Sequence, residues 1–199
     1  VHRDFNIAVV PADELSARTW LIPAGNRRES YGALHRAHLV VVSRCKDEQA
    51  LRSASGQLAQ WTNGPVVGMR MQPVSFRNAL DGVPKEMIEL VGKKVVAFSG
   101  IGNPTSFEES LRSLSVDVRL HHRFTDHHRY TAGELEKIKS SFQNEQGDFI
   151  VTTEKDVARL RGEKNIAAAF FEQNPVYYLE IQPVFVAGED VWKKYLEKF

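Results

Sequence analysis

The sequence contains very little cysteine, no long apolar run and almost no net charge, and each of these absences excludes a class of protein. The single cysteine, Cys45, excludes a disulfide framework and a zinc site built from cysteines, so a reducing compartment is expected. No apolar run approaches the roughly 20 residues that a membrane-spanning helix needs. The formal net charge of +1 argues against a dedicated nucleic-acid-binding protein, which usually carries a basic excess. The 199 residues, 42% of them hydrophobic, predict a globular protein with a substantial core.

Short apolar runs that are typical of β-strands alternate with stretches of helical periodicity. This alternation predicts an α/β fold with a mainly parallel sheet. The predicted strands are 5–10, 39–45, 66–76, 94–100, 116–124, 148–154 and 176–186. The predicted helices are 50–61, 85–91, 106–114, 131–144, 155–161 and 188–198. Turn residues between 64 and 92 predict a linker with one strand, which separates a first α/β unit (1–63) from a second (93–199).

Three strand-to-helix junctions in the second half of the sequence follow one pattern. The segments SGIGNPT, TDHHRY and TTEKD each follow a predicted strand and lead into a residue pair with the spacing of a helix N-terminal cap. These pairs are Ser106 with Glu109, Thr131 with Glu134 and, more weakly, Thr153 with Asp156. If the strands are parallel neighbours, the three loops share the carboxyl edge of the sheet, where α/β proteins bind ligands.

Helix N-termini present free N–H groups, so the ligand expected at this edge is an anion such as phosphate. The residues predicted to line the edge are Gly100, Asn103, Asp126, His127, His128, Glu154 and Lys155. Simpler interpretations exist for each loop, since the glycines can serve a tight turn and TTEKD can be an ordinary charged first turn. The segment GIG continues to Thr105, so it does not match a dinucleotide-binding fingerprint.

The histidines of the two adjacent pairs are expected to differ in role. Strand alternation places His122 on the apolar face of Val116 and Val118, and His121 on the polar face. His127 stands beside Asp126, and a histidine next to a carboxylate suits proton transfer near neutral pH. A polar loop without a catalytic role is the alternative. A metal site would need three or four converging ligands, which adjacent histidines rarely supply.

A second cluster of charge follows the turn LIPAG in the first unit. Arg28 and Glu29 lie here, and the planar fork of arginine suits a phosphate or a carboxylate. A solvated basic turn with one ion pair is the alternative interpretation.

Five segments together resemble the tetraacyldisaccharide 4'-kinase family, the lipid A kinases of Gram-negative outer-membrane biosynthesis. They are RDFNIAVV, LIPAGNRRES with LHRAHLVVVSR, FSGIGNPTSFEESL, FTDHHRYT and VTTEKDVARL, in the order and approximate spacing of that family, from about residue 3 to residue 160. The resemblance implies transfer of the γ-phosphoryl group of ATP, with Mg²⁺, to the 4'-hydroxyl of tetraacyldisaccharide 1-phosphate. It also implies a three-layer α/β/α fold, in which 1–63 is the end of a P-loop-type core and 93–199 is a smaller α/β/α domain. The enzyme is expected in the cytoplasm, at the cytoplasmic face of the inner membrane.

The resemblance also assigns roles by position. His127, with Asp126, matches the motif histidine that pairs with an acidic residue near the nucleophile, and is the expected catalytic residue. Arg28 and Glu29 match the pair that lines the phosphate-bearing site, although Asn26 and Arg27 precede them where the family usually has other residues. The remaining substrate- or phosphate-binding candidates are Gly100, Asn103, Glu154 and Lys155.

The family's phosphate-binding loop is missing from this sequence. That loop needs Gly, four residues and Gly-Lys-Ser/Thr, but the only Gly-Lys is Gly92-Lys93, which Lys94 follows, and Met87 occupies the place of the first glycine. The sequence also starts without an initiator methionine or a signal peptide, at Val1. We therefore expect the C-terminal portion of a longer kinase, inactive alone, whose missing part binds ATP and Mg²⁺.

Two other functions are compatible with these residues. The first is a non-catalytic α/β module that binds phosphorylated sugars or lipids through the same edge. The second is a metallohydrolase that uses His121, His122, His127 and His128 as ligands.

Overall fold

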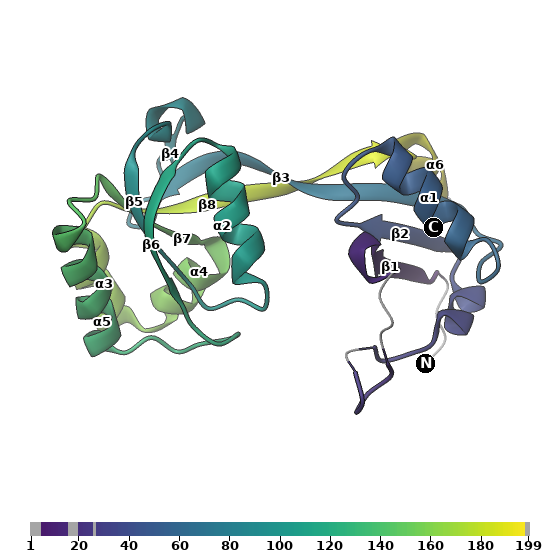
Figure 1. Cartoon of the computed structure of the whole chain (residues 1–199), viewed down its shortest axis with the longest axis horizontal. Coiled ribbons are helices and arrows are strands. Elements are labelled where there is room, and N and C mark those ends of the chain that lie inside the picture. The colour runs from purple at the N-terminus through teal and green to yellow at the C-terminus, as the bar shows by residue number, and fades with distance from the viewer. Residues whose placement is uncertain (1–4, 16–19, 26, 198–199) are drawn as a thin grey trace. The chain divides into compact units, whose positions relative to one another are not determined.

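The computed structural model of the chain describes residues 5–15, 20–25 and 27–197, except for the side chains of residues 164 and 165. The chain forms two compact units (Figure 1): unit 1 comprises Val1–Gln72 and Pro183–Phe199, and unit 2 comprises Pro73–Gln182. These bounds differ from the predicted domains 1–63, 64–92 and 93–199, most of all because the end of the chain belongs to unit 1. Within the described ranges, no helix has the length and apolar character that crossing a membrane requires.

Unit 1 is built on parallel strands, and its strand β2 is buried on both faces. Its elements are β1 (Ile7–Pro11), η1 (Ala12–Glu14), η2 (Tyr31–Arg36), β2 (Leu39–Ser43), α1 (Glu48–Leu58), the first part of β3 (Val66–Asn78), the end of β8 (Val176–Ala187) and α6 (Glu189–Leu196). β2 pairs in parallel with both β1 and β3. Val40 and Val42 pack against α1, whereas Leu39 and Val41 pack on the opposite side with Trp192 of α6. This double burial explains the uninterrupted apolar run of β2.

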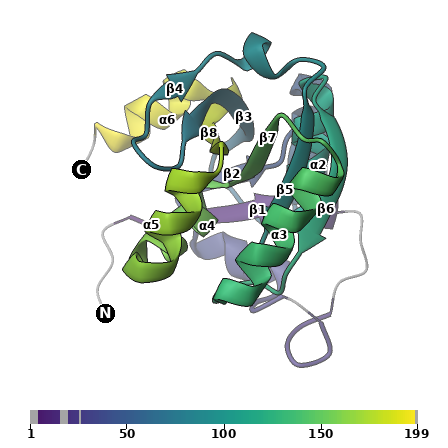
Figure 2. The same ribbon diagram turned by 90° about the vertical axis from the view of Figure 1, so that its left-hand side faces the viewer.

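Unit 2 is a three-layer structure around a parallel sheet (Figure 2). Its elements are the rest of β3, β4 (Pro84–Lys85), η3 (Met87–Leu90), β5 (Lys94–Ser99), α2 (Pro104–Ser113), β6 (Asp117–Arg123), α3 (Ala132–Asn144), β7 (Phe149–Thr153), α4 (Glu154–Gly162), α5 (Lys164–Gln173) and the first part of β8. Strands β8, β7, β5 and β6 are adjacent in that order and all parallel, whereas β4 is antiparallel to β3. Phe107 and Leu111 of α2 cover one face, and α3, α4 and α5 cover the other. The predicted α/β fold with a mostly parallel sheet is confirmed.

Every predicted strand is present, with ends that differ by at most two residues. The structure adds α5, which the sequence did not predict, and turns the predicted helix 85–91 into the short 3₁₀ helix η3. The predicted capping by Ser106 with Glu109 is wrong, because Asn103 caps α2 and Pro104 occupies the first turn. Thr131 and Thr153 cap α3 and α4 as predicted.

The predicted faces of the histidines on β6 are also wrong. The pairing of β5 with β6 shifts register between Val95 and Val96, so β6 carries one extra residue beside Arg119. A bulge of this kind interrupts the alternation of side chains, and every residue after it changes face. His121 consequently packs against Phe107 on the face of α2, whereas His122 hydrogen-bonds Ser141 of α3 on the opposite face.

Candidate functional site

Three strand-to-helix junctions meet at one edge of the sheet in unit 2: the loops after β5 and β6, and the direct step from β7 into α4. β5 lies between β6 and β7, and all three strands are parallel, so their carboxyl ends are neighbours. Two hydrogen bonds tie the first two loops together, from the Phe124 N–H to the Ser99 carbonyl (2.8 Å) and from the His127 N–H to the Gly100 carbonyl (3.2 Å). The prediction that these loops share an edge is therefore confirmed.

A buried carboxylate, that of Asp156 in the first turn of α4, connects the three loops. It is 0% exposed and accepts hydrogen bonds from the Gly100 N–H (3.1 Å), the Tyr130 hydroxyl (2.9 Å) and the Thr153 hydroxyl (2.6 Å). Arg159, one turn later, donates to the same carboxylate at 3.0 Å. A charge this deeply buried is stable only when it is paired and fully hydrogen-bonded, as it is here.

Tyr130 closes the loop after β6 onto this carboxylate. Its ring packs edge-on against Phe98 in the core, and its hydroxyl donates to Asp156. Burial, together with the nearby negative charge of Asp156, raises the pKa of the Tyr130 hydroxyl. The phenol is therefore a fixed donor that holds the loop in place.

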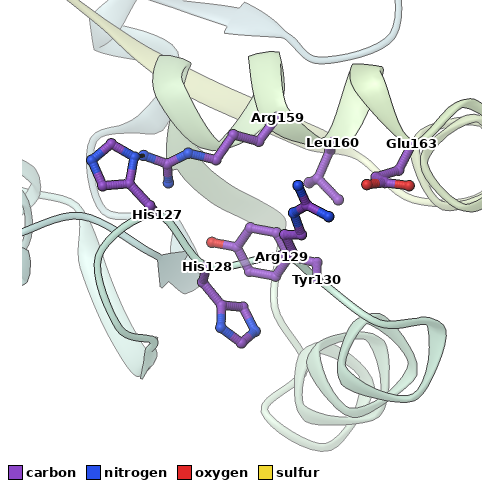
Figure 3. A pocket seen from close by; sticks show the side chains of 7 residues that line it. All are labelled: His127, His128, Arg129, Tyr130, Arg159, Leu160 and Glu163. Atoms are coloured by element: carbon purple, nitrogen blue, oxygen red, sulfur yellow. Dashed lines mark hydrogen bonds between the residues drawn. The ribbon is translucent and has the colours of Figure 1, made fainter.

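Arg159 extends from this buried cluster to the exposed end of the site. Its Nη1 donates to the Gly100 carbonyl at 2.6 Å, and its Nη2 lies 3.4 Å from His127 Nδ1 and 3.9 Å from Asp126 Oδ1. Figure 3 shows the guanidinium directed at the His127 ring. The ring itself is open to solvent, with a side chain that is 83% exposed, and its Nε2 lies 3.7 Å from Asp126 Oδ2.

The backbone at His127 is left-handed, with φ of 59°. Histidine is one of the residues that occur more often than average in this region. The Asp126 carboxylate accepts from the His127 N–H at 2.9 Å, which supports this local turn. The left-handed conformation aims the His127 ring away from the core and toward Arg159 (Figure 3).

The neighbouring His128 has a different environment. Its Nε2 lies 3.1 Å from the Glu134 carboxylate at the start of α3, and its ring stacks on Phe124. His121 and His122 lie on opposite faces of β6, so the four histidines do not converge. Within the described part of the chain, no group of three or more His, Cys, Asp or Glu side chains is placed to hold a metal ion. The structure thus gives no support to the metallohydrolase hypothesis.

A cavity of about 270 Å³ opens between this loop and α4 (Figure 3). Its lining residues are His127, His128, Arg129, Tyr130, Arg159, Leu160 and Glu163. Two arginines and two histidines face it against one carboxylate, which favours an anionic group.

Gly100 is required by the close approach of the three loops. A Cβ atom at this position would lie 3.0 Å from His128 Cβ, 3.1 Å from the Tyr130 hydroxyl and 3.2 Å from Asp156 Oδ1. Any larger side chain would therefore push the three loops apart. The glycine serves the packing of the edge, in addition to any contact with a ligand.

The other predicted residues of unit 2 lie around the same edge. Asn103 accepts a hydrogen bond from the Ser106 N–H at 3.1 Å, and it thereby caps α2. Glu154 and Lys155 are exposed in the first turn of α4. Their proposed contacts with substrate stay predictions.

Behind the edge, a chain of hydrogen bonds runs from Ser99 through His121 to Glu108. His121 Nε2 lies 2.9 Å from the Ser99 hydroxyl, and its Nδ1 lies 3.0 Å from Glu108 Oε2. Hydrogen bonds from Arg123, His121 and Arg112 lower the pKa of Glu108 to about 2. Burial lowers the pKa of His121, against the opposing effect of the Glu108 hydrogen bond. Ser99 is itself fully buried, so this chain orients the start of the Gly100 loop.

The predicted Arg28 and Glu29 lie in unit 1. Both are exposed, and Glu29 forms an ion pair with Arg36 of η2. The neighbouring Arg27 stacks on the Tyr31 ring, with 3.7 Å between its guanidinium carbon and the ring centroid. Asn26, which distinguishes this loop from the family pattern, lies outside the described residues. Roles for Arg28 and Glu29 in phosphate binding stay predictions.

Three residues of the cluster, Asp156, Tyr130 and Arg159, were not singled out from the sequence. Asp156 belongs to a capping pair, and Arg159 follows it by three positions on the same helix. That spacing could have indicated an ion pair on one helix face. It could not have indicated that this face is buried against Gly100 and Tyr130.

Comparison with known proteins adds a family to this geometry. Residues 1–199 match the family described as "Tetraacyldisaccharide-1-P 4'-kinase". The chain is 32% identical over 163 residues to a tetraacyldisaccharide 4'-kinase of Bdellovibrio bacteriovorus. The aligned region covers 81% of this chain and 48% of that protein. It is also 32% identical over 201 residues to the tetraacyldisaccharide 4'-kinase of Chlorobium limicola, covering 100% of this chain and 55% of that protein.

A solved structure is also similar. It is the "apo" form of LpxK from Aquifex aeolicus in complex with ATP, with a TM-score of 0.64 and 26% sequence identity. The match covers 98% of this chain and 53% of that one. The chain thus spans about half the length of the curated relatives it matches.

Proposed function

Because the chain belongs to the tetraacyldisaccharide-1-P 4'-kinase family, we propose that it is part of an ATP-dependent kinase of lipid A biosynthesis. The acceptor is the 4'-hydroxyl of a tetraacyldisaccharide 1-phosphate. The match along residues 1–199 is the observation that carries this proposal. The edge of unit 2, with Asp126, His127 and Arg159 at its exposed end, is the part of this chain that takes part in the chemistry.

His127 is assigned the proton-handling role, with Asp126 as its electrostatic partner. The ring is exposed to an incoming substrate, and its Nε2 lies 3.7 Å from Asp126 Oδ2, a distance of electrostatic contact without a direct hydrogen bond. Imidazole is the side chain that most often transfers protons near neutral pH. These properties support acid–base assistance at the acceptor hydroxyl.

Substrate and phosphate contacts are assigned to residues near the same loops and to the arginine-containing turn of unit 1. They are Gly100, Asn103, Glu154, Lys155, Arg28 and Glu29. The N-termini of α2 and α4 lie at this edge, and the helix dipole favours negative charge there. Arg28, exposed in unit 1, has the fork geometry that suits a phosphate.

ATP is the proposed phosphoryl donor, and Mg²⁺ would neutralise charge on the transferred group. The Aquifex aeolicus relative solved with ATP supports the choice of nucleotide. The described residues of this chain do not fit Mg²⁺, since they include no group of three or more His, Cys, Asp or Glu side chains placed to hold a metal ion. The sequence also lacks the Gly-Lys-Ser/Thr loop that cradles nucleotide phosphates. We therefore assign both groups to residues outside this chain, which by itself is expected to be inactive.

Attachment to the cytoplasmic face of the inner membrane is part of the proposal. Trp20, Leu21 and Ile22 are exposed, and they precede Arg27 and Arg28 along the chain. Tryptophan prefers the membrane interface, and basic residues are attracted to anionic lipids. Co-sedimentation of the complete protein with anionic vesicles tests this, and a protein that stays in the supernatant would contradict it.

The function is tested by assaying ATP-dependent phosphorylation of tetraacyldisaccharide 1-phosphate by the complete reading frame that contains this chain. We expect His127→Ala to lower kcat by about 10²- to 10⁴-fold, the usual contribution of a general acid or base, with little change in the KM for ATP. His35→Ala, at an exposed histidine on η2, is the matched control and leaves kcat unchanged.

Three outcomes would each contradict a part of the proposal. Unchanged kcat in His127→Ala removes the acid–base role, and phosphorylation by the 199-residue chain alone removes the need for a further part. A reading frame that starts at Val1 and has no Gly-Lys-Ser/Thr loop would favour the non-catalytic module that binds phosphorylated sugars or lipids.

A further inference from the structure

Arg159 is the only described residue that joins the buried cluster directly to the His127 ring. Its side chain is 23% exposed, and its Nη1 is held by the Gly100 carbonyl at 2.6 Å and by the fully buried Asp156 carboxylate at 3.0 Å. Its Nη2 lies 3.4 Å from His127 Nδ1. The guanidinium is planar, so fixing Nη1 also fixes the direction in which Nη2 points. A rigid donor therefore faces an otherwise exposed imidazole.

The direction of this contact selects one tautomer of His127. A guanidinium has N–H donors and no acceptor, so His127 Nδ1 must present its lone pair to Arg159. In the neutral ring the proton then resides on Nε2. This nitrogen faces the Asp126 carboxylate, at 3.7 Å, which can only accept. Arg159 and Asp126 thus favour the same tautomer, each at a different ring nitrogen.

We infer that Arg159 is a positioning residue that fixes the orientation of His127 and keeps its neutral form protonated at Nε2. The inference rests on the proposed function, in which His127 handles a proton near the acceptor hydroxyl with Asp126 as its electrostatic partner. A ring held in this way offers its N–H to a carboxylate at one defined atom. Without Arg159 the ring of His127, which is 83% exposed, loses its anchor at Nδ1 and can turn over or exchange tautomers.

The tautomer can be measured directly in the complete protein without substrate. Long-range ¹H–¹⁵N correlation spectra of ¹⁵N-histidine-labelled protein at pH 8 separate protonated from unprotonated ring nitrogens. We expect the wild-type His127 ring to carry its proton on Nε2. A wild-type ring protonated at Nδ1 would overturn the inference, and this measurement requires no variant to fold.

The role of Arg159 is then tested with Arg159→Met, which keeps the length of the side chain and removes its donors. We expect a mixture of His127 tautomers and a fall in kcat of about 10²-fold, the usual cost of a misplaced catalytic group, with an unchanged KM for ATP. Arg159→Lys, which keeps a donor, restores part of kcat and of the Nε2 tautomer. An Arg159→Met protein that retains the wild-type tautomer and kcat would overturn the positioning role.

Arg161→Met is the matched control, because it makes the same substitution on the same helix α4 at a guanidinium that donates to the Ala79 carbonyl rather than to His127. We expect it to leave the His127 tautomer and kcat unchanged, and an Arg161→Met protein with the defect of Arg159→Met would show that the loss of any arginine of α4 suffices. The two proposals fail separately. A protein without lipid kinase activity but with the Nε2 tautomer contradicts the proposed function alone, whereas an active enzyme with the Nδ1 tautomer contradicts only this inference.

Discussion

Asp156 shows how strongly the site depends on one buried charge. Its carboxylate holds Gly100, Tyr130, Thr153 and Arg159, which come from three different loops and one helix. Removing one partner of such an arrangement leaves polar groups buried without partners, and this typically costs 3–5 kcal/mol when an ion pair is broken. The exposed His127 is consequently supported, through Arg159, by a carboxylate that is fully buried.

His121 should make stability depend on pH. Burial lowers its pKa, so the folded ring stays neutral at pH values where the unfolded chain, with a pKa near 6.5, takes up a proton. The contribution of His121 to stability is therefore complete above about pH 6.5 and is lost as the pH falls toward the lowered pKa of the folded state. His122, whose pKa burial also lowers, contributes in the same direction.

We expect the free energy of unfolding, measured by urea titration at intervals from pH 7.5 to pH 5, to fall as the pH is lowered. In His121→Gln this fall should be smaller, because one of the responsible groups is gone. The same substitution at the exposed His35 should leave the slope as it is in the wild type. A His121→Gln protein with the full wild-type slope would contradict this explanation.

Sequence reasoning at this scale placed Gly100, Asp126 and His127 at the edge and missed Asp156, Tyr130 and Arg159. Asp126 and His127 stand out because polar residues after a strand suggest a ligand edge. Asp156 has the same sequence appearance as any acidic residue in the first turn of a helix, where the helix dipole favours it. Its burial depends on Gly100 and Tyr130, which lie 56 and 26 positions earlier in the chain. Sequence spacing alone does not encode contacts of that separation.

At the scale of elements, Gly100 and Gly133 should respond in opposite ways to alanine. A Cβ at Gly100 meets atoms of three side chains at 3.0 to 3.2 Å, whereas Gly133, in α3, has no such neighbour within 4 Å. We expect Gly100→Ala to destabilise the protein by about 1–3 kcal/mol through overpacking. Gly133→Ala should stabilise it by about 0.4–1 kcal/mol, because alanine restricts the unfolded chain.

Thermal and urea unfolding of the two variants measure these changes. Crowding at the edge of the sheet predicts that Gly100→Ala also impairs catalysis, because the displaced side chains include Asp156. If both substitutions changed stability equally, the side chains around Gly100 would be able to move away from a Cβ atom more easily than the distances of 3.0 to 3.2 Å indicate.

The elements themselves were predictable where periodicity was strong. All the strands except the two-residue β4 were found, because parallel strands that are buried in a sheet read as short apolar runs. α5 was missed because it begins directly after α4, shares Glu163 with it as a boundary residue and has no side-chain cap. The bulge in β6 was missed because one inserted residue leaves the composition of a strand unchanged while it reverses the faces of His121 and His122.

At the scale of the whole chain, unit 2 is continuous in sequence whereas unit 1 is not. Unit 2 contains both of its own apolar clusters, one on each face of its sheet. We therefore expect residues 73–182 to fold without the rest of the chain. A dispersed amide spectrum and a cooperative urea transition of this segment would agree with that expectation, and a collapsed spectrum would contradict it.

The passage of β3 and β8 between the units makes unit 2 an insertion in the topological sense. The chain leaves unit 1 along β3 and re-enters it along the neighbouring strand β8, near residues 72 and 183. Unit 2 can therefore be deleted and unit 1 closed with a short loop. Unit 2 can also be replaced by the corresponding unit of a relative. Chimeras made at this junction would transfer Arg159, His127 and the buried Asp156 together with unit 2. The turn that contains Arg28 belongs to unit 1 and would stay unchanged.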